Sequence, residues 1–510
     1  MPELTGSVER IDLGLGYALT APGLRGQAEL LEGGMPEARA AEASTDLLEE
    51  MLARTGMANA RTVKIMAESV PVAGSAADLR DVDGNDALML EVPDLGPEAG
   101  QVVMSVDEAG AITWHFPMDG AQIQPPTVRG AGLTKRFYIR RDVPSTPPTE
   151  APPTRALFGA LGRKLLKVLI FPISDALIGK PAEFLAERWE SANRAYGIRR
   201  FAPADYRLET RSQADRERLA LTSEDVNRFA RGRALLFIHG AFSSSHGAFH
   251  DIPLEAMERL YQRYGGRVFA FNHFTLSHDP RQNVTRLLDG LRQLAPNGRI
   301  EIDVICHSRG GLVTRTIAEG KHSFGLDTGY LDVRRVVFAG VPNRGTVLAQ
   351  ADHMIEMIDR LTTVLNLVPP GGVADVFEGI LIAVKIIGHG ALKALGGLQS
   401  MCPHGDFLKQ LNAGGRKDSE YFGIAANYEP TDRGLRSIVT RTADAVVDRI
   451  FVQDENDLVV PEHGVYETNG SESFPIPADR CLRLPSSAGV MHTDMFGNAQ
   501  VVRQILAWLS

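Results

Sequence analysis

The segment DVICHSRGGLVTR, residues Asp303 to Arg315, gives the clearest indication of the fold of this chain. An apolar run that ends at Cys306 predicts a buried strand, and a helical pattern begins two residues after Ser308. A serine on such a sharp turn needs small neighbours, because a larger side chain two residues away would collide with the strand or the helix. Gly310 is one small neighbour, and Cys306 stands where the G-x-S-x-G pattern has its first glycine. The segment therefore predicts that Ser308 is a nucleophile rather than an ordinary turn serine.

Strands and amphipathic helices alternate around this segment, from about residue 231 onward. The predicted strands are ALLFIHG, RVFAFN, IEIDVIC and VRRVVFAGVP, and the predicted helices include NVTRLLDGLRQLA and GGLVTRTIAEG. This order predicts an α/β fold with a mostly parallel sheet and helices on both of its faces. Active sites of such sheets lie at the carboxyl ends of the strands. Ser308 follows one of those ends.

A second candidate feature lies about seventy residues upstream, in LLFIHGAFSSSHGAF. A predicted strand ends there at His239 and Gly240, and the backbone N–H of Ala241 follows directly. Such an N–H can stabilise an oxyanion that develops beside a nucleophile. A Gly/Ser loop without a catalytic role is the alternative, but the serine turn downstream favours the oxyanion loop.

A serine nucleophile needs a general base, which in this strand order follows a late strand. His492 lies in a loop between the last predicted strand and the helix NAQVVRQILAWLS. His463, in PEHG, and His307, beside the serine, are rivals that lack this position. The pattern therefore predicts His492 as the base.

The base in turn needs a carboxylate that orients it. The segment RIFVQDENDLVVP predicts a strand followed by three acidic residues, Asp454, Glu455 and Asp457. It lies between the serine and the histidine, so the order Ser, Asp, His expected for a triad on such a sheet is present. Position alone leaves the choice of acid open.

Six segments, in this order, resemble those of α/β-hydrolase-fold lipases and esterases. They are FIHG, CHSRGGLV, FAGVPNRGT, SMCPHGDFLKQLN, ENDLVVP and GVMHTD. They resemble the oxyanion loop, nucleophile turn, following strand, post-lid segment, acid and histidine of that family. The resemblance covers about residues 234–510 and nothing before them. Its main departure from the family pattern is Cys306.

The resemblance implies an α/β-hydrolase fold and a role for each candidate residue. It implies Ser308 as the nucleophile, His492 as the base and Asp457 as the acid. It implies the backbone N–H groups of Ala241 and Arg309 as the donors of the oxyanion hole. The resemblance thus selects Asp457 over Asp454 as the acid.

The resemblance also implies an activity. It implies a serine hydrolase that cleaves small-molecule or lipid-like carboxylic esters through an acyl-enzyme, without a metal or cofactor. An amidase or thioesterase is an alternative, because a triad does not specify its leaving group. A non-catalytic interaction protein on a hydrolase scaffold is an alternative from a different class. The joint presence of serine, acid, histidine and oxyanion loop favours the enzyme.

Composition divides the chain into four parts. Residues 1–141 contain short β-rich runs such as TVKIMAESVPV, ALMLEVPDL and QVVMSVDEAGAITWHF, which predict a sandwich-like module. Residues 142–154, DVPSTPPTEAPPT, predict a proline-rich linker. Residues 155–230 predict a helical bridge that is broken at its prolines. Residues 231–510 are the α/β unit.

An apolar insertion at about residues 346–410 interrupts the α/β unit after its fourth predicted strand. It predicts two helices, around Met354 to Leu365 and Phe377 to Leu395, with PPGG between them. A long connection over the carboxyl ends of strands is often functional, which favours a cap, or lid, over the serine. A helical subdomain that covers the core or pairs two chains is the alternative.

Whole-chain composition argues against several classes of partner. The net charge of -9 and the isoelectric point near 5.9 provide no basic field for nucleic acid. Three cysteines argue against a disulfide framework, and no leader is evident, so we expect a cytoplasmic protein, with leaderless export left open. The apolar stretch at residues 376–398 contains ionisable residues, so we expect no transmembrane segment; peripheral membrane contact is left open.

Overall fold

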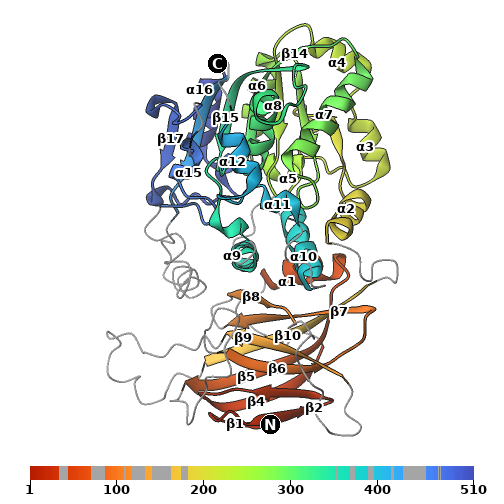
Figure 1. Ribbon diagram of the computed structural model, residues 1–510, viewed down its shortest axis with the longest axis vertical. Coiled ribbons are helices and arrows are strands. Elements are labelled where there is room, and N and C mark those ends of the chain that lie inside the picture. The colour runs from red at the N-terminus through yellow and green to blue at the C-terminus, as the bar shows by residue number, and fades with distance from the viewer. Residues whose placement is uncertain are drawn as a thin grey trace.

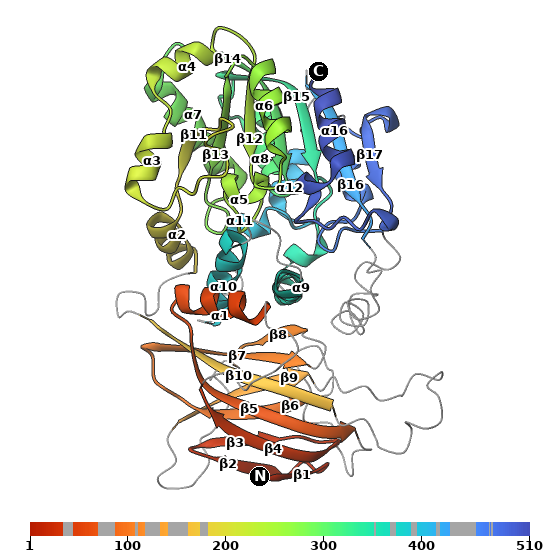
Figure 2. The same cartoon turned by 180° about the vertical axis from the view of Figure 1, so that it is seen from behind.

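The computed structural model consists of two bodies that are stacked along the long axis of the molecule (Figure 1 and Figure 2). The amino-terminal body is built from antiparallel sheets, and the carboxyl-terminal body has a mostly parallel sheet between layers of helices. The structure describes residues 1–33, 44–69, 87–107, 111–117, 133–140, 162–173, 182–350, 353–367, 374–388, 395–414, 419–428, 455–468, 470 and 473–510.

Two antiparallel sheets form the first body. The six-stranded sheet has the order β1 (Glu3–Thr5), β4 (Leu24–Glu32), β5 (Ala58–Ser69), β10 (Gly162–Pro172), β7 (Ala99–Asp107), β8 (Ile112–His115). The four-stranded sheet has the order β2 (Arg10–Gly14), β3 (Tyr17–Thr20), β6 (Ala87–Pro93), β9 (Thr134–Arg140). One apolar core joins them, with Val63 and Val103 from the first sheet packed with Leu90 and Phe137 from the second. This is the β-rich body that the sequence predicts.

Strand β10 corrects the predicted helical bridge. Residues Gly162–Pro172 are not helical but pair with β5 and β7 in the middle of the six-stranded sheet. The sequence misleads because both faces of this strand are buried: Leu166 and Val168 face the second sheet, while Leu169 and Phe171 face the helices. An apolar run buried on both faces has no period of two and can be taken for a helix. The predicted linker, residues 142–154, lies outside the described residues.

The second body is built on a seven-stranded sheet. Its order is β11 (Gly197–Arg200), β13 (Val268–Asn272), β12 (Ala234–Ile238), β14 (Ile300–His307), β15 (Leu331–Ala339), β16 (Glu420–Ala426), β17 (Cys481–Leu484). All neighbours pair in parallel except β11, which is antiparallel to β13 at one edge. The mostly parallel sheet agrees with the prediction. The body begins before residue 231, however, because β11 belongs to the sheet.

Helices cover both faces of this sheet. One face carries α4 (Ser223–Phe229), α7 (Pro280–Leu294), α8 (Gly310–Phe324) and α12 (Asp406–Asn412). The other carries α5 (Ser245–Phe249), α6 (Leu254–Arg263) and α16 (Ala499–Trp508). Successive residues of β14 serve the two cores, since Val304 packs on the first face and Ile305 on the second. This double burial explains the continuous apolar run before Ser308.

Helices α1 (Ser44–Arg54), α9 (Met354–Leu367) and α10 (Ala374–Gly388) lie between the two bodies (Figure 1 and Figure 2). Helices α9 and α10 occupy the predicted insertion. The N–H of Trp114, on edge strand β8, donates to Asp359 Oδ1 at 2.8 Å, and the N–H of Ile112 donates to Thr363 Oγ1 at 2.9 Å. Side chains of α9 thus satisfy backbone groups on the edge of the amino-terminal sheet. No helix among the described residues is long and apolar enough to cross a bilayer.

Candidate active site

Ser308 lies on a strained turn at the carboxyl end of the central strand β14. Its φ is +52°, in the left-handed region that non-glycine residues rarely adopt. Two backbone bonds hold the turn: the N–H of Ser308 donates to the carbonyl of Ala339 at 2.9 Å, and its carbonyl accepts from Gly311 at 2.9 Å. Helix α8 begins two residues later. Strain that the surroundings hold in place in this way is typical of a functional residue.

Close packing explains the glycines near this turn. A Cβ on Gly310 would lie 2.4 Å from the carbonyl oxygen of Ile238, and a Cβ on Gly240 would lie 2.7 Å from the Cβ of Ser308. Cys306, the departure from the glycine pattern, is fully buried, and its Sγ donates to the carbonyl of Val337 at 3.4 Å. Burial raises the pKa of the Cys306 thiol, so it stays protonated and serves as a small packing residue.

Alanine at Gly310 is expected to destabilise the protein. The added methyl group meets backbone oxygens that cannot rotate away, so the free energy of unfolding should fall by about 1–3 kcal/mol. Gly320→Ala, in the same helix, is the matched control, because a Cβ there lies 3.4 Å from its nearest neighbours, which are side-chain methyl groups. Its gain in helix propensity should raise stability by about 0.5–1 kcal/mol. Chemical denaturation measures both changes, and equal effects would contradict the packing given for Gly310.

The structure brings His492 and Asp457 together. His492 Nδ1 lies 2.8 Å from Asp457 Oδ2, and the N–H of His492 donates to the carbonyl of Asp457 at 3.1 Å. The other carboxylate oxygen, Oδ1, accepts from the N–H groups of Val459 at 3.0 Å and Val460 at 2.8 Å. Both side chains are buried. The carboxylate is therefore fixed by the backbone on one side and holds the imidazole on the other. Asp454 lies outside the described residues.

His307 joins the nucleophile turn to the histidine loop. Its Nε2 is 2.8 Å from the carbonyl oxygen of His492, and the two rings lie 4.8 Å apart. Burial lowers the pKa of His307 to about 3, so the ring is neutral and its Nε2–H donates to that carbonyl. Because Ser308 follows His307 directly, this bond holds the serine turn beside His492. The other rival, His463, begins the short helix α15 (His463–Tyr466), which packs against β16.

Neighbouring residues orient the loop that carries Ala241. The N–H of His273 donates to His239 Nε2 at 3.2 Å, so the ring hydrogen of neutral His239 lies on Nδ1, which is 2.9 Å from the carbonyl oxygen of Gly240. Burial lowers the pKa of His239 to about 3, which keeps this tautomer neutral. In a trans peptide the carbonyl and the next N–H point in opposite directions, so the N–H of Ala241 points away from His239.

Two further contacts complete the loop and the turn. Phe242 has a φ of +60°, and its N–H donates to Thr275 Oγ1 at 3.1 Å. The Arg309 side chain is fully buried and donates from Nε to the carbonyl of Gly397 at 2.7 Å, away from the turn backbone. Burial lowers the pKa of Arg309 to about 10. Its side chain therefore anchors the turn, and only its backbone N–H is a candidate for the oxyanion hole.

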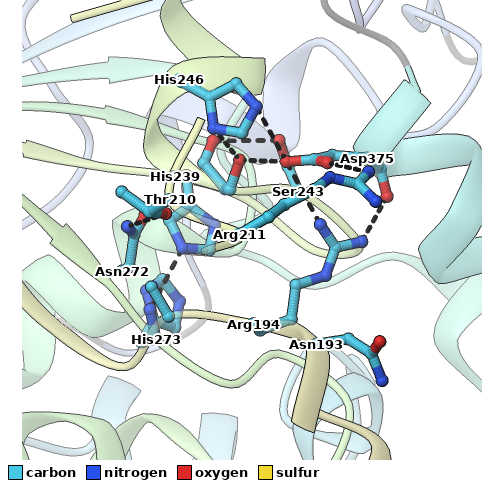
Figure 3. Close-up of a pocket in the computed structure, with 12 residues that line it drawn as sticks. Asn193, Arg194, Thr210, Arg211, His239, Ser243, His246, Asn272, His273 and Asp375 are labelled. Atoms are coloured by element: carbon cyan, nitrogen blue, oxygen red, sulfur yellow. Dashed lines mark hydrogen bonds and ion pairs between the residues drawn. The ribbon is translucent and has the colours of Figure 1, made fainter. Parts of the chain in front are cut away.

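The sequence did not point to the polar groups behind this loop. A small pocket there is lined by Arg194, Arg211, His246, Asn272 and Asp375 among others (Figure 3). The available signal was Asp375 in the first turn of a mostly apolar helix, because an aspartate that such a helix buries needs a polar partner. Among the described residues, no group of three or more His, Cys, Asp or Glu side chains is arranged to hold a metal ion.

Comparison with known structures finds distant similarities. EstA from Clostridium botulinum is 14% identical, covers 60% of this chain and 95% of its own, and has a TM-score of 0.35. Lipase 1 from Pelosinus fermentans is 12% identical over 54% of this chain and 97% of its own, with a TM-score of 0.34. Phospholipase PlaB from Legionella pneumophila is 14% identical over 46% of this chain, with a TM-score of 0.30. The match covers 45% of that phospholipase, less than half of its length.

Comparison with curated proteins finds no match. One family model matches residues 193–510, which is more than half of the chain and contains the whole seven-stranded sheet together with Ser308, Asp457 and His492. The model is described as a domain of unknown function, DUF7379. The chain belongs to this DUF7379 family.

Proposed function

We propose that the protein is a serine hydrolase of the α/β-hydrolase fold that cleaves carboxylic esters. The observation that carries this proposal is the buried Asp457–His492 pair, which lies beside the strained turn of Ser308 through the His307 bond. The order of strands and the chain order Ser, Asp, His are those expected for this fold. A strained serine beside an oriented histidine has the parts that nucleophilic catalysis needs.

In the proposed reaction, His492 acts as general base and Asp457 orients it. Asp457 accepts the hydrogen on Nδ1, which leaves Nε2 of His492 without a proton and able to take one from Ser308. The Ser308 oxygen attacks the ester carbonyl, and the protonated His492 then gives its proton to the leaving alcohol. His492 then takes a proton from water, which attacks the acyl-enzyme, and returns that proton to the Ser308 oxygen as the acid is released. Asp457 stabilises the imidazolium that forms twice in this cycle.

The N–H groups of Ala241 and Arg309 stabilise the oxyanion in this proposal. The Gly240 carbonyl is turned toward His239, so the N–H of Ala241 points to the opposite side. The N–H of Phe242 is already bonded to Thr275, which leaves Ala241 as the donor of this loop. Gly240 provides the close approach, because any side chain at that position would meet Ser308. Preorganised donors of this kind supply a large part of the rate enhancement in acyl transfer.

Helices α9 and α10 form the proposed cap. Val364 of α9 packs with Leu458 and Met491, which are the neighbours of Asp457 and His492 in the chain. Gly379 of α10 lies against the oxyanion loop, since a Cβ there would be 2.7 Å from the carbonyl oxygen of Phe242. Ser308 is only 5% exposed, which supports a cover over the nucleophile in this proposal. The same helices contact the amino-terminal sheet, so they serve both packing and the site in this proposal.

A fluorophosphonate probe followed by an ester panel tests the proposed function. The probe phosphonylates activated serines with loss of fluoride, so the intact protein should be labelled and Ser308→Ala should not. Esters, amides and thioesters of the same acyl group then separate the esterase from the amidase and the thioesterase. If the intact protein is not labelled, a non-catalytic scaffold is favoured. If labelling persists in Ser308→Ala, a different nucleophile is favoured.

A further inference from the structure

Asp375 is a buried carboxylate of the cap with several polar partners. It lies in the first turn of α10 and is 2% exposed. Its carboxylate is 3.2 Å from Arg194 Nη1, 3.0 Å from Arg211 Nη2 and 3.1 Å from His246 Nε2. The hydroxyl of Ser244 also donates to it, at 2.5 Å. Figure 3 shows Arg194, Arg211 and His246 converging on Asp375 from different elements. A buried carboxylate with this many partners is expensive to disturb.

Two of the partners of Asp375, Ser244 and His246, belong to the segment that continues the oxyanion loop. Ser244 caps the first turn of α5 and follows Ala241 by three residues, and His246 lies in that turn. Ser244 Oγ and His246 Nδ1 are 2.9 Å apart, so the two form one unit around the carboxylate. Arg194 reaches the same loop from the other side, with Nη2 at 3.5 Å from the carbonyl oxygen of Phe242. The stretch from Phe242 to His246 is thus held near α10 at both of its ends.

A second contact fixes the distance between this helix and the loop. Gly379 lies one turn beyond Asp375 on α10, and a Cβ there would lie 3.0 Å from the Cβ of Phe242. Phe242 has positive φ, so its backbone is strained and needs support from its surroundings. That support comes from Thr275 on one side and from α10 on the other. The conformation of the loop therefore depends on where α10 sits.

We infer that Asp375 is a positioning residue for the oxyanion hole: it ties the cap helix α10 to Ser244 and Arg194 and so fixes the loop that presents the Ala241 N–H. This inference rests on the proposed function. In this inference the cap helix α10 does more than cover the site, because it helps to position a donor of the oxyanion hole. Moving α10 away from the sheet would release the loop, so the hole would be complete only when the cap is seated.

The charge of Asp375 is well compensated. Burial alone would raise the pKa of this carboxyl, but Arg194, His246, Ser244 and Arg211 outweigh that effect and hold the pKa below its usual range. Asparagine keeps the size of the side chain and loses its charge. Arg211 would keep Glu378, whose Oε2 is 2.8 Å away, while Arg194 and Ser244 would lose a charged partner. Asp375→Asn should therefore loosen the loop more than it loosens the fold.

The ratio of ester to thionoester hydrolysis reports on the oxyanion hole. A thionoester places sulfur, a weak hydrogen-bond acceptor, where the ester places oxygen, so it gains little from the N–H donors. In Asp375→Asn, kcat/KM for the ester should fall while that for the matched thionoester falls much less. Deleting one oxyanion donor outright costs roughly 100- to 1,000-fold, so a displaced donor should lower the ratio by about tenfold. The fall should appear mainly in kcat.

Asp359→Asn is the matched control. Asp359 is a buried aspartate on the other cap helix, and it accepts from the backbone N–H of Trp114 in the amino-terminal sheet. Its replacement should lower the melting temperature and leave the ester-to-thionoester ratio unchanged. If Asp375→Asn does not fold, Ser244→Ala removes one bond to the same carboxylate and should lower the ratio by a few-fold.

Three results separate the outcomes. A lower ratio in Asp375→Asn or Ser244→Ala, with an unchanged ratio in Asp359→Asn, supports the inference. The inference is overturned if the ratio is unchanged in a folded Asp375→Asn, or if both aspartate variants change it equally. The proposed function stands in either case. Ester turnover by the parent that does not depend on Ser308, or none at all, overturns the proposed function and the inference with it.

Discussion

Ser308→Ala is expected to lower kcat for ester hydrolysis by roughly 10⁴- to 10⁶-fold while the protein stays folded. The hydroxyl that attacks the carbonyl is lost, and no nearby group replaces it: Cys306 is buried and protonated, and its Sγ is bonded to a carbonyl oxygen. Stability should change by less than about 1 kcal/mol, because the substitution removes one oxygen atom and leaves the backbone bonds of the turn in place.

Ser323→Ala is the control for this substitution. Ser323 is a nearly buried serine near the end of α8, and its Oγ is 3.5 Å from the carbonyl oxygen of Leu411. It belongs to the helix that starts at the nucleophile turn but lies at the opposite end. Its replacement should change kcat by less than twofold. Turnover in Ser308→Ala within tenfold of the parent would assign the chemistry to another residue.

Strand patterns made the central sheet predictable. The continuous apolar runs before His239 and Ser308 are buried on both faces, and such runs separated by amphipathic helices are typical of parallel sheets. The nucleophile turn was recognisable because the end of an apolar run, a serine, a following glycine and a helix start occur within a few residues. Local chemistry of this kind is encoded in adjacent positions.

Contacts between distant segments were not predictable in the same way. Strand β10 takes its strand conformation from β5 and β7, which lie about sixty to one hundred residues earlier in the chain. The role of Asp375 depends on Arg194 and Ser244, which are 181 and 131 residues away in the chain. Neither pairing leaves a periodic signal, because the first depends on how the amino-terminal sheet assembles and the second on how α10 packs against the loop after β12. Tertiary contacts decide such cases over local propensity.

The choice of Asp457 among three acids shows what geometry adds to position. From the sequence alone, the acids after the predicted strand were equivalent, and the family resemblance selected Asp457. The structure brings its Oδ2 to His492 and commits its Oδ1 to the N–H groups of Val459 and Val460. A carboxylate with one oxygen fixed by the backbone can orient an imidazole without rotating. Because the two oxygens have different partners, they also determine how the amide of an asparagine at position 457 would be oriented.

Asp457→Asn is expected to lower kcat by roughly 10⁴-fold without unfolding the protein. The amide oxygen can keep the bonds to Val459 and Val460, so the NH₂ group is directed at His492 Nδ1. That nitrogen must then accept a hydrogen bond, and the ring proton moves to Nε2. A protonated Nε2 cannot take the proton of Ser308, so the base is present in the wrong tautomer. The measurement is kcat on a short-chain ester.

Asp494→Asn supplies the comparison that makes this result specific. Asp494 lies two residues after His492, and its Oδ1 accepts from the N–H of Met491 at 2.7 Å. Burial raises its pKa to about 6, so Asp494 still carries most of its charge near neutral pH. Because its Oδ1 is engaged by a backbone N–H, asparagine should change kcat by less than tenfold. Both changes remove a carboxylate near His492. A large loss in Asp457→Asn beside a small one in Asp494→Asn would therefore assign the effect to the direct contact between Asp457 and the imidazole. Equal losses would instead mean that total negative charge near the histidine matters, and Asp457 would then have no special role in orienting it.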